Sequence, residues 1–244
     1  MSAPILLIPI AIEWALLITT LAPVAFTHRF NYRPRLGLAI WFGSLLSAGL
    51  ATGTALAVAV WSYFDTVAAL EANVFGGAKW MAALAVSFGP WLVLLLSAIS
   101  LVLVQTRLEP MVAAAKAVQP AITQAKRPLM NFMGVEVFTI DLPFNYAAAD
   151  SKQLLISTDL KNLLSSDEFE AVLWHELGHI RGKHFALKRL ARLIRLMSPG
   201  LAASTALVSE VERLCEIAAD RFALEHKEAP ALLGARAAFK DSSF

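Results

Sequence analysis

Three long apolar runs dominate the first part of the chain, at residues 4–26, 36–61 and 81–104. A helix of about 20 apolar residues is long enough to cross a lipid bilayer. The second and third runs hold no charged residue, and the first holds only Glu13, although a charge at membrane depth is costly. No basic segment precedes the first run, so a cleaved signal peptide is not expected. The pattern predicts three transmembrane helices.

The connections between the runs predict an orientation. Residues 27–35 carry three arginines, whereas residues 62–80 carry two acids and one lysine. Because lysine and arginine are enriched in cytoplasmic loops, we expect an outside N-terminus and three crossings of the cell membrane. The membrane region is then 1–104, and 105–244 is a cytoplasmic domain. Gly49 and Gly53 form a GxxxG pair that allows close helix approach within or between chains, which leaves a homo-oligomer open.

The pattern changes after the third run. Residues 109–125 have helical periodicity, and two short alternating or apolar segments, 135–140 and 153–157, are typical of strands. Ser165 and Glu168 then have the spacing of a capping box at the start of a helix. Strands followed by helices predict an α+β domain, mainly helical with a small β-sheet.

Composition agrees with a membrane protein and excludes other classes. Hydrophobic residues make up 57% of the 244 residues and charged residues 16%, below the roughly 25% of soluble domains. The net charge of +2 gives no reason to expect direct binding of nucleic acid. One cysteine, Cys215, rules out an intrachain disulfide and suits a reducing compartment.

The helix that begins near Ser165 runs into the sequence HELGH at residues 175–179. His175 and His179 are four residues apart, so both imidazoles project from one helix face and can bind one zinc ion. Glu176 lies beside that face, where a carboxylate can act as general base toward a zinc-bound water. The alternative is a core helix with two hydrogen-bonded histidines. The position after a capped amphipathic helix favours one Zn²⁺ per chain.

A catalytic zinc needs a third protein ligand. His184 lies only five residues after His179, too near to point back at the same metal if the helix continues, so a supporting or surface position is preferred. We expect the ligand from the helix at 209–224. Glu216 is favoured over Glu212, because Asp220 lies one turn later and can orient a ligating histidine through its second ring nitrogen. The alternative is a solvated acidic face paired with arginines.

The stretch at 135–224 resembles the BlaR/MecR-type antirepressor peptidases, a group of membrane gluzincins. The shared elements are LLISTDLKNLLSSDEFEAVLWHELGHI, the basic stretch after it, SPGL and EIAAD. The resemblance implies metal ligands at His175, His179 and Glu216, the base at Glu176 and the supporting aspartate at Asp220. It implies cleavage of a cytoplasmic protein, typically a DNA-binding transcriptional repressor.

Two features qualify this resemblance. Known members of that family also carry a later span and a penicillin-binding sensor domain, which these 244 residues do not contain, so beta-lactam sensing is not expected. The HELGH pattern is also similar to the HtpX-like quality-control proteases and the CAAX-prenyl proteases. Those place further spans between HELGH and the glutamate, whereas only 36 residues separate His179 from Glu216.

The sequence thus predicts a membrane-bound zinc metalloendopeptidase that performs regulated proteolysis, with its substrate extended along residues 135–149. Its expected partners are the lipid bilayer and a protein substrate. The alternatives are a quality-control protease and a zinc-stabilised scaffold or sensor that cleaves nothing. Arg221 and His226 are candidates for stabilising the oxyanion.

Overall fold

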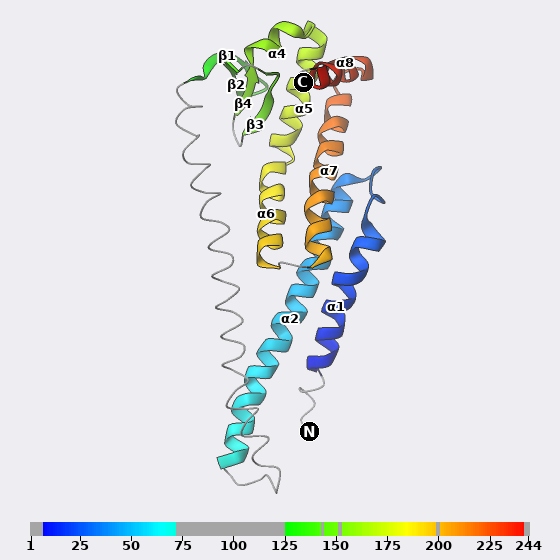
Figure 1. Ribbon diagram of the computed structural model, residues 1–244, viewed down its shortest axis with the longest axis vertical. Coiled ribbons are helices and arrows are strands. Elements are labelled where there is room, and N and C mark those ends of the chain that lie inside the picture. Colours follow the sequence, from blue (N-terminus) through cyan, green and yellow to red (C-terminus); the bar gives the residue numbers. More distant parts are fainter. Residues whose placement is uncertain (1–6, 72–124, 143, 151–152, 199–200, 242–244) are drawn as a thin grey trace. The chain divides into compact units, whose positions relative to one another are not determined.

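The computed structural model describes residues 7–71, 125–142, 144–150, 153–198 and 201–241 (Figure 1). The predicted third span at 81–104 lies outside these residues, so three crossings and the boundary at 104 stay predictions. The chain divides into two compact units. One comprises Met1–Thr27, Ala39–Glu109 and Arg195–Ala206, and the other His28–Leu38, Pro110–Ile194 and Leu207–Phe244.

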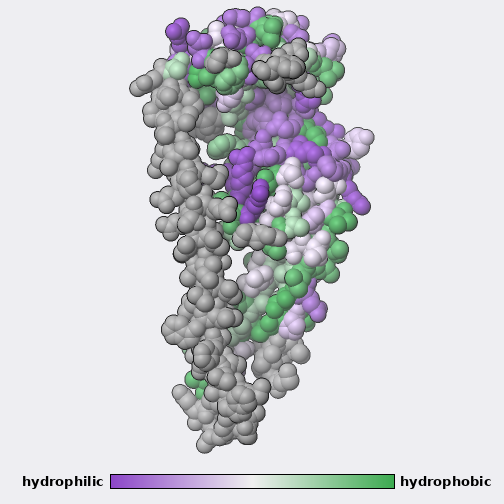
Figure 2. Space-filling model, viewed as in Figure 1, coloured by the Kyte–Doolittle hydropathy of each residue, from purple (hydrophilic) through white to green (hydrophobic). Residues whose placement is uncertain are grey.

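The first unit contains most of two long apolar helices, α1 (Leu7–Phe26) and α2 (Pro34–Glu71). By length and composition, α1 and the Pro34–Ser62 part of α2 can each cross a membrane, and both expose most of their side chains. Figure 2 shows green and pale residues over α1. The helices meet where Phe26 packs edge to face against the buried Trp41, with ring centroids 5.9 Å apart. Two of the three predicted spans are therefore helices of suitable length, and a membrane location is plausible.

The second unit contains a small mixed sheet in the order β1-β2-β4-β3. Its strands are β1 (Arg127–Phe132), β2 (Val135–Ile140), β3 (Ala147–Asp150) and β4 (Gln153–Ser157). β2 and β4 are parallel neighbours, and each pairs with an antiparallel strand on its other side. The two strands that the sequence predicts, β2 and β4, are confirmed with their predicted bounds.

The outer strands β1 and β3 were not predicted from the sequence, for physical reasons. β1 contains Pro128, which cannot donate a ladder hydrogen bond and is tolerated at an edge, and its pairing register shifts between Pro128 and Met130. β3 begins with three alanines, which have a low strand propensity. Met133 (φ 50°) and Gly134 (φ 84°) form the two-residue turn between β1 and β2.

Five helices follow in the described residues: α4 (Thr158–Leu163), α5 (Ser166–Arg181), α6 (His184–Met197), α7 (Ala202–Leu224) and α8 (Ala229–Asp241). The predicted capping box of α5 is confirmed, since the Ser165 hydroxyl accepts from the Glu168 amide and the Glu168 carboxylate accepts from the Ser165 amide. α7 begins seven residues before the predicted start at 209. The α+β class with a small sheet is confirmed.

Two apolar clusters hold α5 in place. Leu173 of α5 packs with Val137, Leu154 and Ile156 of the sheet, all at most 1% exposed. Trp174 and Leu177 belong to the second cluster, with Ala223 of α7 and Leu232 of α8. Burying a side chain of this size contributes about 1.5–3 kcal/mol, so the HELGH segment is fixed between the sheet and two helices.

The connection between α1 and α2 belongs to the second unit, where it binds α7. Glu210 of α7 is only 2% exposed, accepts a hydrogen bond from the His28 amide and pairs with Arg213. The Arg213 guanidinium also donates to Asn31, and Arg221 donates to the carbonyl of Tyr32. A buried carboxylate is stable only when its oxygens have such partners.

Replacing Glu210 with alanine is expected to destabilise the second unit by about 2 kcal/mol, because Arg213 and the His28 amide lose their acceptor. Thermal unfolding of the purified protein in detergent measures this. The matched control is Glu212→Ala, whose pair with Arg192 is largely exposed and is worth under about 1 kcal/mol. Equal losses in the two variants would contradict the account.

Candidate metal centre

One helix supplies three of the predicted site residues. His175 and His179 project from the same face of α5, and their Nε2 atoms lie 3.1 Å apart. Glu176 follows His175 and is 8% exposed. The four-residue spacing that predicted this arrangement therefore brings the two imidazoles together, with a carboxylate beside them.

The third group comes from α7, which passes very close to α5. A Cβ atom added at Gly178 would lie 3.1 Å from the Cα of Ala219, so the missing side chain lets the two backbones approach. This contact places Glu216 Oε2 at 3.5 Å from Nε2 of both His175 and His179. The structure thus brings the favoured glutamate to the two histidines.

The three groups have the chemistry and spacing of a zinc site. His175, His179 and Glu216 offer two imidazole nitrogens and one carboxylate oxygen, all within 4.8 Å of one another. Ligand bonds of 2.0–2.1 Å to a tetrahedral zinc put neighbouring ligand atoms about 3.3 Å apart. The separations of 3.1, 3.5 and 3.5 Å match that value. These residues therefore fit a zinc ion.

Two of the three groups, His175 and Glu216, have a further partner on another helix or one turn away. Asp220 Oδ1 lies 3.0 Å from Nδ1 of His175, and the two buried atoms face each other without the alignment of a regular hydrogen bond. Asp220 also pairs with Arg236 of α8. Lys188 of α6 donates to Glu216 Oε1 at 2.8 Å. Asp220 thus lies where the sequence predicts it, whereas Lys188 was not anticipated.

The alternative ligand, Glu212, is not brought to the site. Its carboxylate pairs with Arg192 at 2.8 Å. Cys215 is fully buried, and burial raises the pKa of its thiol to about 12, so it does not offer a thiolate. Arg221 donates to Tyr32, and His226 stacks on Trp174 with centroids 3.7 Å apart. Neither of these two oxyanion candidates is among the described residues that line the cavity at the site.

His184 is not among the three candidate ligands, which agrees with the sequence-based preference for a supporting or surface position. The expectation assumed a continuous helix, but α5 ends at Arg181 and α6 begins at His184. Lys183 has a left-handed conformation, with φ 53°, and the chain turns there. As a result Nδ1 of His184 lies 2.8 Å from Nδ1 of His179, on the side of that ring opposite the metal-facing nitrogen. His184 is therefore a supporting residue of the site.

The electrostatics of the site follow from its burial. Burial lowers the pKa of His175, but the Asp220 and Glu216 carboxylates beside the ring stabilise its protonated form, outweigh burial and raise that pKa to about 9. Burial raises the pKa of Glu176, which the neighbouring histidines partly offset. Burial is also the main cause that lowers the pKa of His184 to about 4, so this imidazole is neutral at pH 7.

An open cavity of about 440 Å³ lies over these groups. Strand β3 forms one side through Ala147, Ala148 and Ala149, and the start of α6 forms another. The Ala149 amide also donates a hydrogen bond toward Glu176. Purple, hydrophilic residues gather over α5 and the start of α6 in Figure 2. An extended strand and a candidate metal centre therefore face the same space.

Comparison with known proteins adds one finding. Residues 113–240 match the family described as Peptidase family M48, and this span covers more than half of the 244 residues. No curated protein matches the chain. Family M48 enzymes are metallopeptidases that usually use zinc, which agrees with the His–His–Glu group.

Replacing Glu216 with glutamine is expected to weaken zinc binding more than about 100-fold, because it removes a charged ligand. Loss of a residue that only supports a ligand typically weakens metal binding about 10–100-fold. Competition with a chromophoric chelator measures the dissociation constant. Glu212→Gln on the same helix is the control and should bind zinc like the unchanged protein. The ligand assignment is wrong if Glu212→Gln weakens zinc binding more than Glu216→Gln.

Zinc binding is expected to release about one proton near pH 7.5, because the raised pKa of about 9 keeps metal-free His175 protonated. Since zinc must displace that proton, its apparent affinity should rise about tenfold per pH unit between pH 7 and 8.5. Titration calorimetry in buffers of different ionisation enthalpy counts the protons. An affinity independent of pH in this interval would contradict the assignment.

Proposed function

The chain belongs to peptidase family M48, and we propose that it is a membrane-bound zinc endopeptidase that cleaves a cytoplasmic protein in regulated proteolysis. The observation that carries the proposal is the triangle of His175, His179 and Glu216 with the carboxylate of Glu176 beside it. A metal centre with three protein ligands leaves a position for water or substrate, which distinguishes catalytic from structural zinc sites.

Each residue has a definite task in this proposal. His175, His179 and Glu216 would hold a zinc ion, which would supply a Lewis acid and a more acidic water at the site. Glu176 accepts the proton of the attacking water on its carboxylate and passes it to the amine that leaves. The raised pKa of Glu176 suits this role, because the carboxylate is then a stronger base.

The position of β3 supports an extended peptide substrate. In the described part of the chain β3 pairs with β4 alone, so its other edge is available to a further strand. A peptide that adds to such an edge gains backbone hydrogen bonds, and its alternate side chains enter neighbouring pockets. The three alanines of β3 have short side chains, so the backbone of a bound peptide can approach the metal centre closely. The segment of the protein along which we expect the substrate to lie is thereby narrowed from residues 135–149 to residues 147–149.

The connection between α1 and α2 supports a cytoplasmic site. It contains Arg29 and Arg33, and Arg35 follows in the first turn of α2; arginines at this position favour the cytoplasmic side of a membrane. It also belongs to the unit that contains the metal centre and binds α7, the helix of Glu216. If α1 and α2 cross the bilayer, the basic connection and the catalytic groups are on one side.

Replacing Glu176 with glutamine is expected to preserve zinc binding and lower the rate of peptide cleavage by at least about 10³-fold, near the contribution of a general base. Zinc content and cleavage of a quenched fluorescent peptide are measured on the same preparation. The control, Glu170→Gln, changes a half-buried acid of the same helix that pairs with Lys227 and does not line the cavity, and it should retain activity. Cleavage by Glu176→Gln at the unchanged rate contradicts the mechanism.

The same variant tests the substrate class, because a zinc-loaded enzyme that cannot cleave retains what it binds. Crosslinking in cells followed by mass spectrometry should recover one or a few cytoplasmic proteins, such as a DNA-binding repressor. Recovery of many damaged membrane proteins supports a quality-control protease instead. A wild-type protein that binds zinc and cleaves nothing is a scaffold.

A further inference from the structure

We propose that His184 is a positioning residue of the metal centre, which accepts the hydrogen on Nδ1 of His179 and so directs the lone pair of Nε2 toward the metal. The inference rests on the proposed zinc site and adds a residue to it. His184 is not one of the three candidate ligands, and in this role it acts through His179.

The rings of His179 and His184 face each other through their Nδ1 atoms. Nε2 of His179 faces Nε2 of His175 and Glu216, whereas its Nδ1 faces Nδ1 of His184 at 2.8 Å. A neutral imidazole has one N–H and one bare nitrogen, and a metal binds the bare one. The hydrogen of His179 must then be on Nδ1. Nδ1 of His184 is therefore the acceptor, and the hydrogen of His184 is on its own Nε2.

Gly182 leaves the space that the ring of His184 occupies. The His184 ring is 4% exposed and lies directly over Gly182, where an added Cβ atom would be 2.2 Å from Nε2. Gly182 has φ −77° and ψ −6°, a conformation that any residue adopts. The glycine is thus required by the ring of His184 and not by the backbone.

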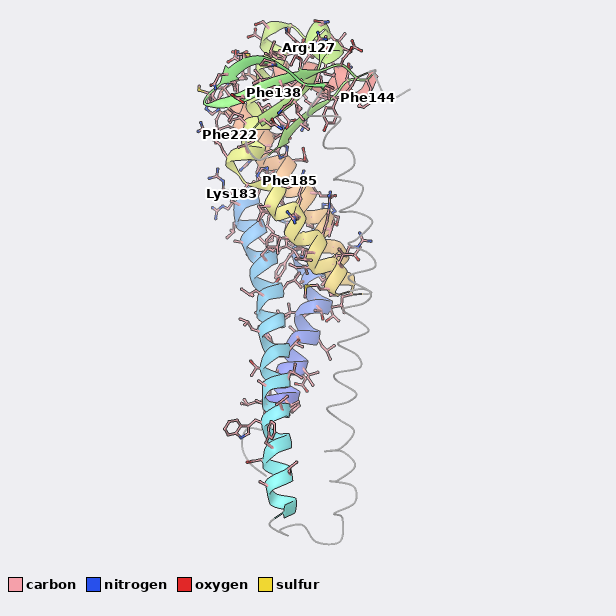
Figure 3. All side chains as sticks on the ribbon, turned by 90° about the vertical axis from the view of Figure 1, so that its left-hand side faces the viewer. Arg127, Phe138, Phe144, Lys183, Phe185 and Phe222 are labelled. Carbon is pink, nitrogen blue, oxygen red and sulfur yellow. The ribbon has the colours of Figure 1, made fainter. Side chains whose placement is uncertain are left out.

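The turn between α5 and α6 lies at Lys183. Lys183 adopts a left-handed conformation, which costs a residue other than glycine about 1 kcal/mol. Figure 3 shows Lys183 and Phe185 at this turn, on either side of His184 in sequence. Both are exposed while His184 is buried. The turn therefore buries one side chain of the three, that of His184, against His179.

The partners of the three candidate ligands complete the argument. Asp220 lies behind His175, and Lys188 lies against Glu216. Without His184, Nδ1 of His179 would be the one ligand group of the three lacking such a contact. Supporting partners of this kind fix the ring and typically contribute 10–100-fold in metal affinity. The first two turns of α6 provide two of them, His184 and Lys188.

The test measures zinc affinity by chelator competition and the unfolding temperature of the metal-free protein for four variants. His184→Ala removes the acceptor, and Gly182→Ala displaces the ring while both histidines stay in the chain. Each is expected to weaken zinc binding about 10–100-fold. His184→Asn should retain most of the affinity, because its Oδ1 can take the place of Nδ1. Arg189→Ala, an exposed change on α6, is the control.

The double variant Gly182→Ala/His184→Ala gives the sharpest readout. Once the ring is absent, the added methyl group has nothing to displace, so the double variant should bind zinc as His184→Ala does. A merely structural role of His184 predicts a lower unfolding temperature with unchanged zinc affinity, and that result would overturn the inference. If the unchanged protein binds no zinc at all, the proposed function fails. If the unchanged protein binds zinc, and both His184→Ala and Gly182→Ala bind it with the same affinity as the unchanged protein, only the positioning role fails.

Discussion

The metal centre depends on the close contact between α5 and α7 at Gly178 and Ala219. The approach of 3.1 Å between a Cβ position and a backbone atom leaves no room for a larger side chain. It brings Glu216 to the two histidines and, one turn later, Asp220 to the far nitrogen of His175. The apolar packing of Trp174 and Leu177 against α7 and α8 holds the contact together. A modest change in helix separation would break the triangle.

The same two helices connect the site to the rest of the second unit. α5 lies against the sheet, whose strand β3 forms one side of the cavity. α7 binds the connection between α1 and α2 through the buried Glu210, less than two turns before Glu216. The basic connection and the third ligand group are therefore parts of one packed structure. This supports the proposal that substrate and catalytic groups meet on the side of the membrane where the arginines lie.

Much of the site could be predicted, because its residues obey short-range rules. The capping box, the four-residue spacing of His175 and His179, and the one-turn spacing of Glu216 and Asp220 are local consequences of helix geometry. The strands β2 and β4 are central and apolar, and the sequence predicts both. Strand β3 was missed since alanines give no strand signal. For His184 the sequence preferred a supporting or a surface position without choosing between them, since the choice depends on a left-handed residue, Lys183, that no periodicity reveals; the Gly182 before it was the available hint.

The most direct test is the crystal structure of the zinc-loaded protein with anomalous diffraction at the zinc edge. The account predicts one strong peak at about 2.0–2.2 Å from Nε2 of His175, Nε2 of His179 and a carboxylate oxygen of Glu216, with room for a fourth ligand. A peak elsewhere, or a protein loaded with zinc in which Glu216 does not reach the ion, would contradict it.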